Sequence, residues 1–176
     1  MKSDNLLLVT GSGRNSGKTT IVCKIIEQFS HLGIVAVKIS PHFHSPSGGL
    51  IHLSGKPGFN IFEETDRNSL KDTSRMLQSG ARKVYFIQSG EEYLNEAFSI
   101  VYKSIASGNP VICESPALIN YIKPELFIIM ISPSDSNLKN IENQRRLPHL
   151  EYTYEEIIKT TKLPIDFAEG AWKSLK

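Results

Sequence analysis

Cysteine is scarce in this sequence: Cys23 and Cys113 are the only two among 176 residues. Two cysteines cannot make a disulfide framework or a zinc site with four cysteine ligands. Both lie in apolar runs, which favours buried thiols in a reducing compartment. An excess of charge of one sign is also missing, since 20 Lys and Arg face 18 Asp and Glu, a net charge of +2. This balance excludes a strongly basic nucleic-acid binder and gives no electrostatic reason to expect a membrane surface as partner.

Long hydrophobic runs are absent as well. The longest, residues 126–131, falls far short of the roughly 20 residues that a membrane helix needs. The apolar stretch near the N-terminus is too short for a signal peptide. We therefore expect a cytoplasmic protein. With 40% hydrophobic and 22% charged residues, the composition is globular, and the length suits one domain over residues 1–176.

Apolar runs alternate with segments of helical spacing along most of the chain. This alternation predicts an α/β fold with a mostly parallel, twisted sheet and helices on both of its faces. Two helices should begin with a capping box, at Ser89–Glu92 and at Thr153–Glu156. The expected strands are 6–9, 34–39, 83–87, 110–114 and 126–131, and the expected helices are 19–32, 68–79, 89–107, 136–146 and 153–160.

The alternation fails over residues 40–68, which are rich in proline and glycine. A loop of this length in a compact domain is usually functional or mobile, so we expect a lid-like loop there, with room for a short strand at 50–53. Three histidines, His42, His44 and His52, fall in this stretch. Their spacing matches no closed zinc site, which favours substrate contact or plain loop polarity.

The strongest motif follows the first expected strand, where residues 10–20 read Thr-Gly-Ser-Gly-Arg-Asn-Ser-Gly-Lys-Thr-Thr. Such a loop cradles nucleotide phosphates, because its glycines let backbone N–H groups turn inward and the following helix adds its positive end. Lys18 should reach the β- and γ-phosphates, and the Thr19 hydroxyl should bind Mg²⁺. The predicted nucleotide-binding residues are Gly11, Gly13, Arg14, Asn15, Ser16, Gly17, Lys18, Thr19 and Thr20.

A magnesium nucleotide also needs a carboxylate. Glu114 ends the fourth expected strand, and ligands of open α/β sheets bind at the carboxyl ends of strands. Asp66 and Asp72, which border the 40–68 stretch, are further candidates. Lys38 stands near the end of the second strand, where a buried ammonium is costly unless it has a partner or a site to serve. We predict Lys18, Lys38 and Glu114 as catalytic residues and Thr19, Glu114 and Asp72 as metal ligands.

These residues together resemble the P-loop NTPases of molybdopterin-guanine dinucleotide biosynthesis protein B (MobB). The resemblance runs from the first strand to about residue 132 and is most particular at Lys71-Asp72-Thr73-Ser74-Arg75, followed by Ser79-Gly80-Ala81. It implies that the phosphate loop holds a GTP-type nucleotide with Mg²⁺, that Glu114 serves the metal, and that Asp72 and Arg75 line the site. It also implies an accessory role: a homodimer that assists a nucleotidyl transferase in attaching a GMP unit to molybdopterin.

The chain is also similar to dethiobiotin synthetase, which has the same five-residue gap as between Gly11 and Gly17 and a lysine on the second strand. That resemblance implies an ATP-dependent kinase or ligase acting on a small anionic substrate, with Lys38 central to the transfer. A nucleotide-binding regulator without turnover is the third alternative. The base stays open between ATP and GTP, because the usual guanine-selecting motif is absent; residues 132–137 are a candidate for base contact.

Overall fold

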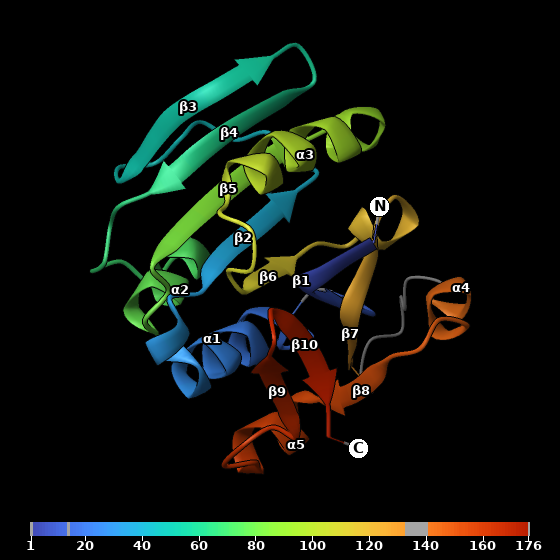
Figure 1. Cartoon of the computed structure of the whole chain (residues 1–176). Coiled ribbons are helices and arrows are strands. Elements are labelled where there is room, and N and C mark those ends of the chain that lie inside the picture. The colour runs from blue at the N-terminus through green and yellow to red at the C-terminus, as the bar shows by residue number, and fades with distance from the viewer. Residues whose placement is uncertain (1, 14, 133–140, 176) are drawn as a thin grey trace.

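The computed structural model describes residues 2–13, 15–132 and 141–175. In this part of the chain, eight strands form one sheet in the order β3-β4-β5-β2-β6-β1-β7-β8, and β9 and β10 form a separate hairpin (Figure 1). The strands are β1 (Lys2–Gly11), β2 (Val35–Ser40), β3 (Leu50–Lys56), β4 (Phe59–Glu64), β5 (Lys83–Ser89), β6 (Val111–Glu114), β7 (Lys123–Ile131), β8 (Leu150–Thr153), β9 (Ile165–Ala168) and β10 (Ala171–Ser174).

Six of the eight strands in the sheet run parallel. From β5 through β2, β6, β1 and β7 to β8, every neighbouring pair is parallel, so the carboxyl ends of these strands meet at one edge of the sheet. The helices are α1 (Lys18–Gln28), α2 (Asp72–Gln78), α3 (Leu94–Ser104), α4 (Glu142–Arg145) and α5 (Tyr154–Lys159), with short 3₁₀ turns η1 (Ser30–Leu32), η2 (Glu91–Tyr93) and η3 (Leu118–Asn120).

Two hydrophobic cores lie on the two faces of the sheet. Along β1, Leu7 and Val9 belong to one core and Leu6 and Leu8 to the other, because successive side chains of a strand point to opposite faces. The first core is covered by α1, α2, α5 and the β9–β10 hairpin, and the second by α3 and η3. The expected α/β fold with helices on both faces is confirmed.

The stretch 40–68 differs from the expected lid-like loop. Residues 50–64 form an antiparallel hairpin, β3–β4, and β4 continues the sheet antiparallel to β5 (Figure 1). The turn is Pro57-Gly58, where Gly58 has φ 106°, a left-handed value that favours glycine. Phe59 and Ile61 join the core under α3, and this burial stabilises the hairpin. The strand expected at 50–53 thus extends to Lys56.

One of the two predicted capping boxes is present. Thr153 and Glu156 exchange their side-chain and backbone hydrogen bonds at the start of α5, as expected. The Ser89–Glu92 box is wrong: Ser89 still belongs to β5, and its hydroxyl donates to the carbonyl of Gly90. The helix expected at 89–107 is accordingly η2 followed by α3. Of the helix expected at 136–146, residues 136–140 lie outside the described part, and α4 occupies 142–145.

The C-terminal hairpin closes the first core. Trp172 on β10 is 1% exposed, and its indole Nε1 donates to the carbonyls of Asn5, at 3.0 Å, and Val111, at 3.2 Å. Phe29 and Phe167 meet its ring edge-to-face, with centroids 5.3 and 5.0 Å away. The tail beyond α5 is therefore a structural part of the domain.

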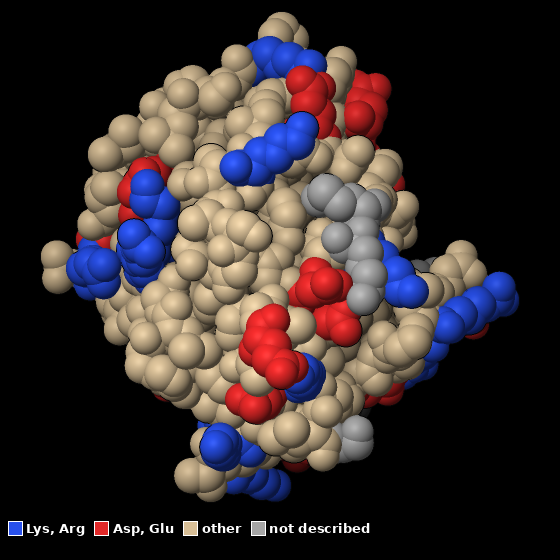
Figure 2. All heavy atoms as spheres, in the orientation of Figure 1, with Lys and Arg blue, Asp and Glu red and all other residues tan. Residues whose placement is uncertain are grey.

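The surface and the cysteines agree with the composition. On the face in Figure 2, Lys and Arg lie in several separate places among Asp and Glu. Cys23 and Cys113 are buried free thiols. In the part of the chain that the structure describes, no helix combines the length and the apolar character needed to cross a membrane.

Candidate functional site

The phosphate loop connects the end of β1 to the start of α1, at the carboxyl edge of the sheet. Gly17 caps α1 with φ 91°, and a Cβ there would lie 3.1 Å from the side chains of Met130 and Tyr154. A Cβ on Gly11 would lie 2.2 Å from the Ser16 hydroxyl. Neither position has room for a side chain, so the loop's path depends on both glycines. Arg14, predicted to bind phosphate, lies outside the described residues.

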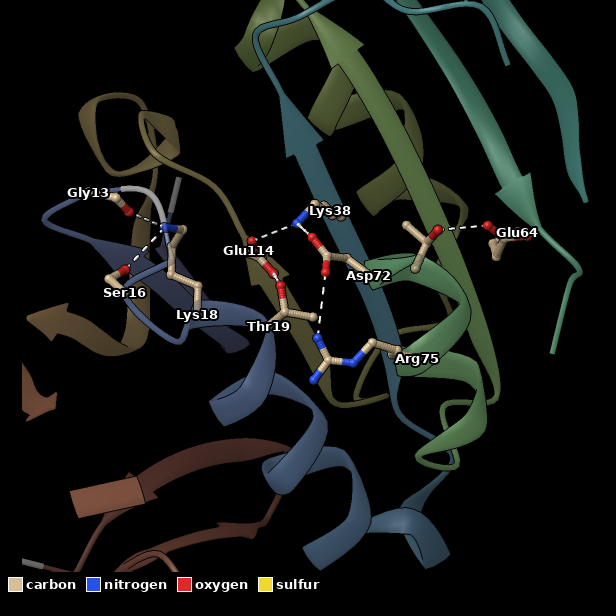
Figure 3. A network of polar contacts seen from close by, with 10 residues as sticks. Gly13, Ser16, Lys18, Thr19, Lys38, Glu64, Asp72, Arg75 and Glu114 are labelled. Atoms are coloured by element: carbon tan, nitrogen blue, oxygen red, sulfur yellow. Dashed lines mark hydrogen bonds and ion pairs between the residues drawn. The ribbon is translucent and has the colours of Figure 1, made fainter. Parts of the chain in front are cut away.

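Lys18 folds back over the loop that it follows. Its Nζ donates to the Gly13 carbonyl at 2.7 Å and to the Ser16 hydroxyl at 3.2 Å (Figure 3). The loop is fastened to β7 by Ser12, whose N–H donates to the Met130 carbonyl and whose hydroxyl accepts from the Ser132 N–H, both at 2.9 Å. The ammonium therefore already lies against the backbone of the loop, on a flexible stem that can carry it to a phosphate.

Four side chains from different elements meet beside this loop (Figure 3). The Thr19 hydroxyl at the start of α1 donates to Glu114 Oε2 at 2.9 Å. Lys38 on β2 donates to Glu114 Oε1 and to Asp72 Oδ2, each at 2.7 Å. The parallel pairing of β2 with β6 sets Lys38 directly opposite Glu114. The topology thus brings together residues that are far apart in the sequence.

Lys38 stays charged despite its burial. Desolvation works against the ammonium, but attraction by Glu114 and Asp72 and the hydrogen bonds to both outweigh it, so the pKa of Lys38 is raised above its usual value. One ammonium thereby neutralises part of the charge of two carboxylates. Asp72 has a second cation nearby, because Arg75 Nη1 lies 3.6 Å from its Oδ1 (Figure 3).

The donor groups of Thr19 and Glu114 fit a magnesium ion. Mg²⁺ prefers hard oxygen ligands, and the hydroxyl and the carboxylate lie 2.9 Å apart at the mouth of the phosphate loop. Asp72, also predicted as a ligand, accepts a hydrogen bond from Lys38 through Oδ2 and is 44% exposed. Among the described residues, no group of three or more His, Cys, Asp or Glu is placed to hold a metal.

These residues line one cleft of about 480 Å³. It contains all the predicted nucleotide-binding residues that the structure describes, together with Lys38, Asp72, Arg75 and Glu114. Of the three histidines only His42 lines it, and Asp66 does not. The motifs did not indicate five further lining residues, Ile39, Ser40, Pro41, Pro116 and Tyr154.

A second cavity, of about 330 Å³, adjoins the cleft. Its walls come from the phosphate loop, the end of β7 and the start of α5: Asn15, Ser16, Ile131, Ser132, Thr153, Tyr154 and Glu155. Sequence reasoning missed the α5 contribution. The capping box at Thr153 predicted where α5 begins. The start of α5 reaches the phosphate loop because β8 pairs with β7, and no local sequence signal indicates this pairing.

Glu64, at the end of β4, is another residue that the motifs did not indicate. It is 2% exposed and accepts hydrogen bonds from the N–H groups of Thr65 and Asp66 and from the Thr73 hydroxyl. Because Thr73 follows Asp72 in the first turn of α2, this carboxylate fastens the helix that carries Asp72 to the hairpin.

No family model and no curated protein sequence matches this chain. Among solved structures it is similar to LpxK from Aquifex aeolicus in complex with ATP, with a TM-score of 0.50, 17% identity, and coverage of 86% of this chain. The chain spans about half of that protein, 48% of its length. The likeness concerns the fold alone. This chain has the fold of the P-loop NTPases, with a mostly parallel sheet, helices on both faces of the sheet and a phosphate loop.

Proposed function

We propose that this protein binds a nucleoside triphosphate with Mg²⁺ and acts as an accessory GTPase of the MobB type. The observation that carries the proposal is the convergence of Lys18, Thr19, Lys38, Asp72 and Glu114 in one cleft beside the phosphate loop. They come from four elements, α1, β2, α2 and β6. No packing requirement explains a partly buried lysine between two carboxylates.

The roles follow from the contacts. Lys18 leaves the Gly13 carbonyl for the β- and γ-phosphates, which are stronger partners because both charges are complementary. Thr19 and Glu114 would hold Mg²⁺, which would supply neutralisation of the phosphate charge. The N–H groups of the loop bind the remaining oxygens. Catalysis in such a site rests on positioning and electrostatics rather than on a covalent intermediate.

Lys38 and Arg75 supply the positive charge on the other side of the cleft. Both contact Asp72, so a single carboxylate orients the two cations. When a phosphoryl group carries more negative charge in the transition state, cations already held in place stabilise it without reorganisation. The residues of the MobB resemblance thus lie where they can act on one nucleotide. By that resemblance, the protein would assist a nucleotidyl transferase as a homodimer.

A second candidate is an ATP-dependent kinase or ligase of the dethiobiotin synthetase type. The observation that favours it is the extent of the cleft, which continues beyond Lys38 to Ser40, Pro41 and His42. An anionic acceptor there would lie next to the Lys38 ammonium, between it and the γ-phosphate. Under this alternative the protein would turn over ATP only when the acceptor is present.

Calorimetric titration with ATP and with GTP, each with Mg²⁺, tests the proposal. We expect binding that Lys18→Ala weakens at least ~100-fold, because the charge-assisted phosphate contact is lost. Lys103→Ala, an exposed lysine on α3, is the matched control and should bind as the parent does. Equal binding by Lys18→Ala would contradict the proposal. A preference for ATP would favour the second candidate, and binding without hydrolysis would favour a regulator.

A further inference from the structure

The cavity beside the phosphate cleft is placed where the rest of a nucleotide must go. Cleft and cavity share three residues, Asn15, Ser16 and Tyr154. A triphosphate in the loop would leave its nucleoside within reach of the space that these residues border. A volume of about 330 Å³ is at the lower end for small-molecule sites. Because it shares lining residues with the cleft, it suits one moiety of a larger ligand that occupies both.

The helix that borders this cavity is held firmly. Its strand, β8, pairs in parallel with the end of β7, and its capping box ties the Thr153 hydroxyl and N–H to Glu156. Ile157 anchors the same turn in the first core with no exposure. Tyr154 and Glu155 lie between the N-cap residue Thr153 and its capping-box partner Glu156, so a rigid turn holds them in place. Specific contacts require such rigid placement.

Tyr154 has the properties of a stacking platform. Its ring lies beside Gly17, close enough that a Cβ on that glycine would be 3.1 Å from it. It nevertheless remains 48% exposed, although a large apolar ring is costly to leave in water. Bases stack on such aromatic faces regardless of their identity.

Glu155 supplies the chemistry that a stacking ring lacks. It lines the same cavity, and within the described part of the chain its carboxylate makes no hydrogen bond or ion pair, whereas Glu156 is engaged in the capping box. A carboxylate accepts hydrogen bonds and donates none. Guanine offers it two neighbouring donors, N1–H and the 2-amino group, while the corresponding edge of adenine presents an acceptor at N1.

We propose that this cavity is the nucleoside subsite, in which Tyr154 stacks on the base and Glu155 selects guanine over adenine. The inference rests on the proposed function, because it needs a triphosphate in the adjoining cleft. It goes further in naming two residues that decide the base. It also explains how guanine can be chosen without the usual guanine-selecting motif.

The stacking role is tested with Tyr154→Ala and Tyr154→Phe, by titrating GTP and inorganic tripolyphosphate, each with Mg²⁺. We expect the alanine variant to bind GTP about 10- to 100-fold more weakly and tripolyphosphate as the parent does, and the phenylalanine variant to bind both normally. Tyr121→Ala, a similarly exposed tyrosine outside both spaces, is the control. An equal loss of tripolyphosphate binding would overturn the inference, because Tyr154 would then act through the loop.

The selection role is tested with Glu155→Gln, with Glu92→Gln of η2 as the control. The parent should prefer GTP to ATP, and Glu155→Gln should reduce this preference about 10- to 100-fold, mainly through weaker GTP binding. An unchanged preference would overturn the inference alone. A parent that prefers ATP would overturn it together with the GTPase proposal and would favour the second candidate function. Failure to bind tripolyphosphate and both nucleotides would overturn the proposed function as well, so the two failures can be told apart.

Discussion

Two buried glutamates at strand ends, Glu114 after β6 and Glu64 after β4, have opposite surroundings. They are 5% and 2% exposed. Among the described residues, Glu114 accepts hydrogen bonds from side chains alone, the Lys38 ammonium and the Thr19 hydroxyl, whereas Glu64 accepts from two backbone N–H groups and one hydroxyl. A carboxylate bound by side chains can change partners when a ligand arrives. One bound by backbone groups cannot do so unless the chain itself moves.

The difference teaches that burial alone does not identify a functional acid. Glu114 ends a central parallel strand, at the edge where the phosphate loop also begins, while Glu64 leaves an antiparallel hairpin beside α2. Under the proposed function Glu114 serves the ligand, whereas Glu64 holds the hairpin and α2 together. The two glutamates are nevertheless connected through α2 (Figure 3). Thr73 donates a hydrogen bond to Glu64, and its neighbour Asp72 accepts one from Lys38, which also contacts Glu114.

The largest effect is expected at Glu114. Glu114→Gln keeps the shape but removes the charge, so we expect Mg²⁺-dependent nucleotide binding to fall about 100-fold, since a charged oxygen ligand is lost. Nucleotide titrations of the parent and the variant, in Mg²⁺ and in EDTA, measure this. In EDTA the two proteins should bind the nucleotide with nearly the same affinity. Equal losses in both conditions would place Glu114 among the architectural acids with Glu64.

Glu64→Ala should show the reverse pattern. Two backbone N–H groups and a hydroxyl would lose a buried acceptor, which lowers the free energy of unfolding by about 2 kcal/mol. Urea denaturation measures this. Nucleotide affinity at 20 °C should stay within about threefold of the parent, since the site is contacted only through α2. A tenfold loss of affinity without a loss of stability would contradict the comparison.

The ion pair of Glu114 with Lys38 predicts how stability depends on pH. The pKa of Lys38 is raised above its ordinary value of 10.5, so its contribution is complete below that pH and is lost as the pH rises through the raised pKa. The difference in unfolding free energy between the parent and Lys38→Met should therefore be constant from pH 7 to 10 and shrink above. A change between pH 7 and 9 would show that Lys38 titrates there.

The smallest effect is expected at Cys113, which precedes Glu114 on β6. Burial, and after it the Glu114 charge, raises the pKa of this thiol well above its ordinary value. The pKa of Cys23 is raised too, chiefly by burial. Neither thiol should react with a disulfide reagent at pH 8 before denaturation, and Glu114→Gln should leave Cys113 protected. Rapid reaction in that variant would mean that the carboxylate, rather than burial, controls the thiol.

The sequence predicted the parts of the site that are local. The phosphate loop lies between an apolar strand and an amphipathic helix, and Lys38 and Glu114 are polar residues that end apolar strands. Parallel pairing then brings them together. Tyr154 and Glu155 could not be found in this way, because their position depends on β8 pairing with β7, a contact across the sheet without a motif.

The fold was predicted best where burial on both faces makes strands continuously apolar. The β3–β4 hairpin was missed beyond the strand expected at 50–53, because its outer strand lies at the edge of the sheet and is exposed along most of its length. The Pro57-Gly58 pair is nevertheless a turn signal. The capping-box spacing occurs twice in the sequence, and it predicted a real capping box only at Thr153. At Thr153 the chain leaves a strand and enters a helix at once, whereas Ser89 remains in β5 and Gly90 takes the cap position.

The placement of Trp172 has a consequence for synthesis on the ribosome. Its indole fills the space between α1 and the sheet and bonds to β1 and β6, so the first core stays open until β10 has left the exit tunnel. The nascent chain therefore leaves part of the apolar side of α1 uncovered until that hairpin is made. The phosphate loop precedes β10 in the chain, so the core beneath it is completed only after that later hairpin is made, and chaperones can engage the chain in the interval.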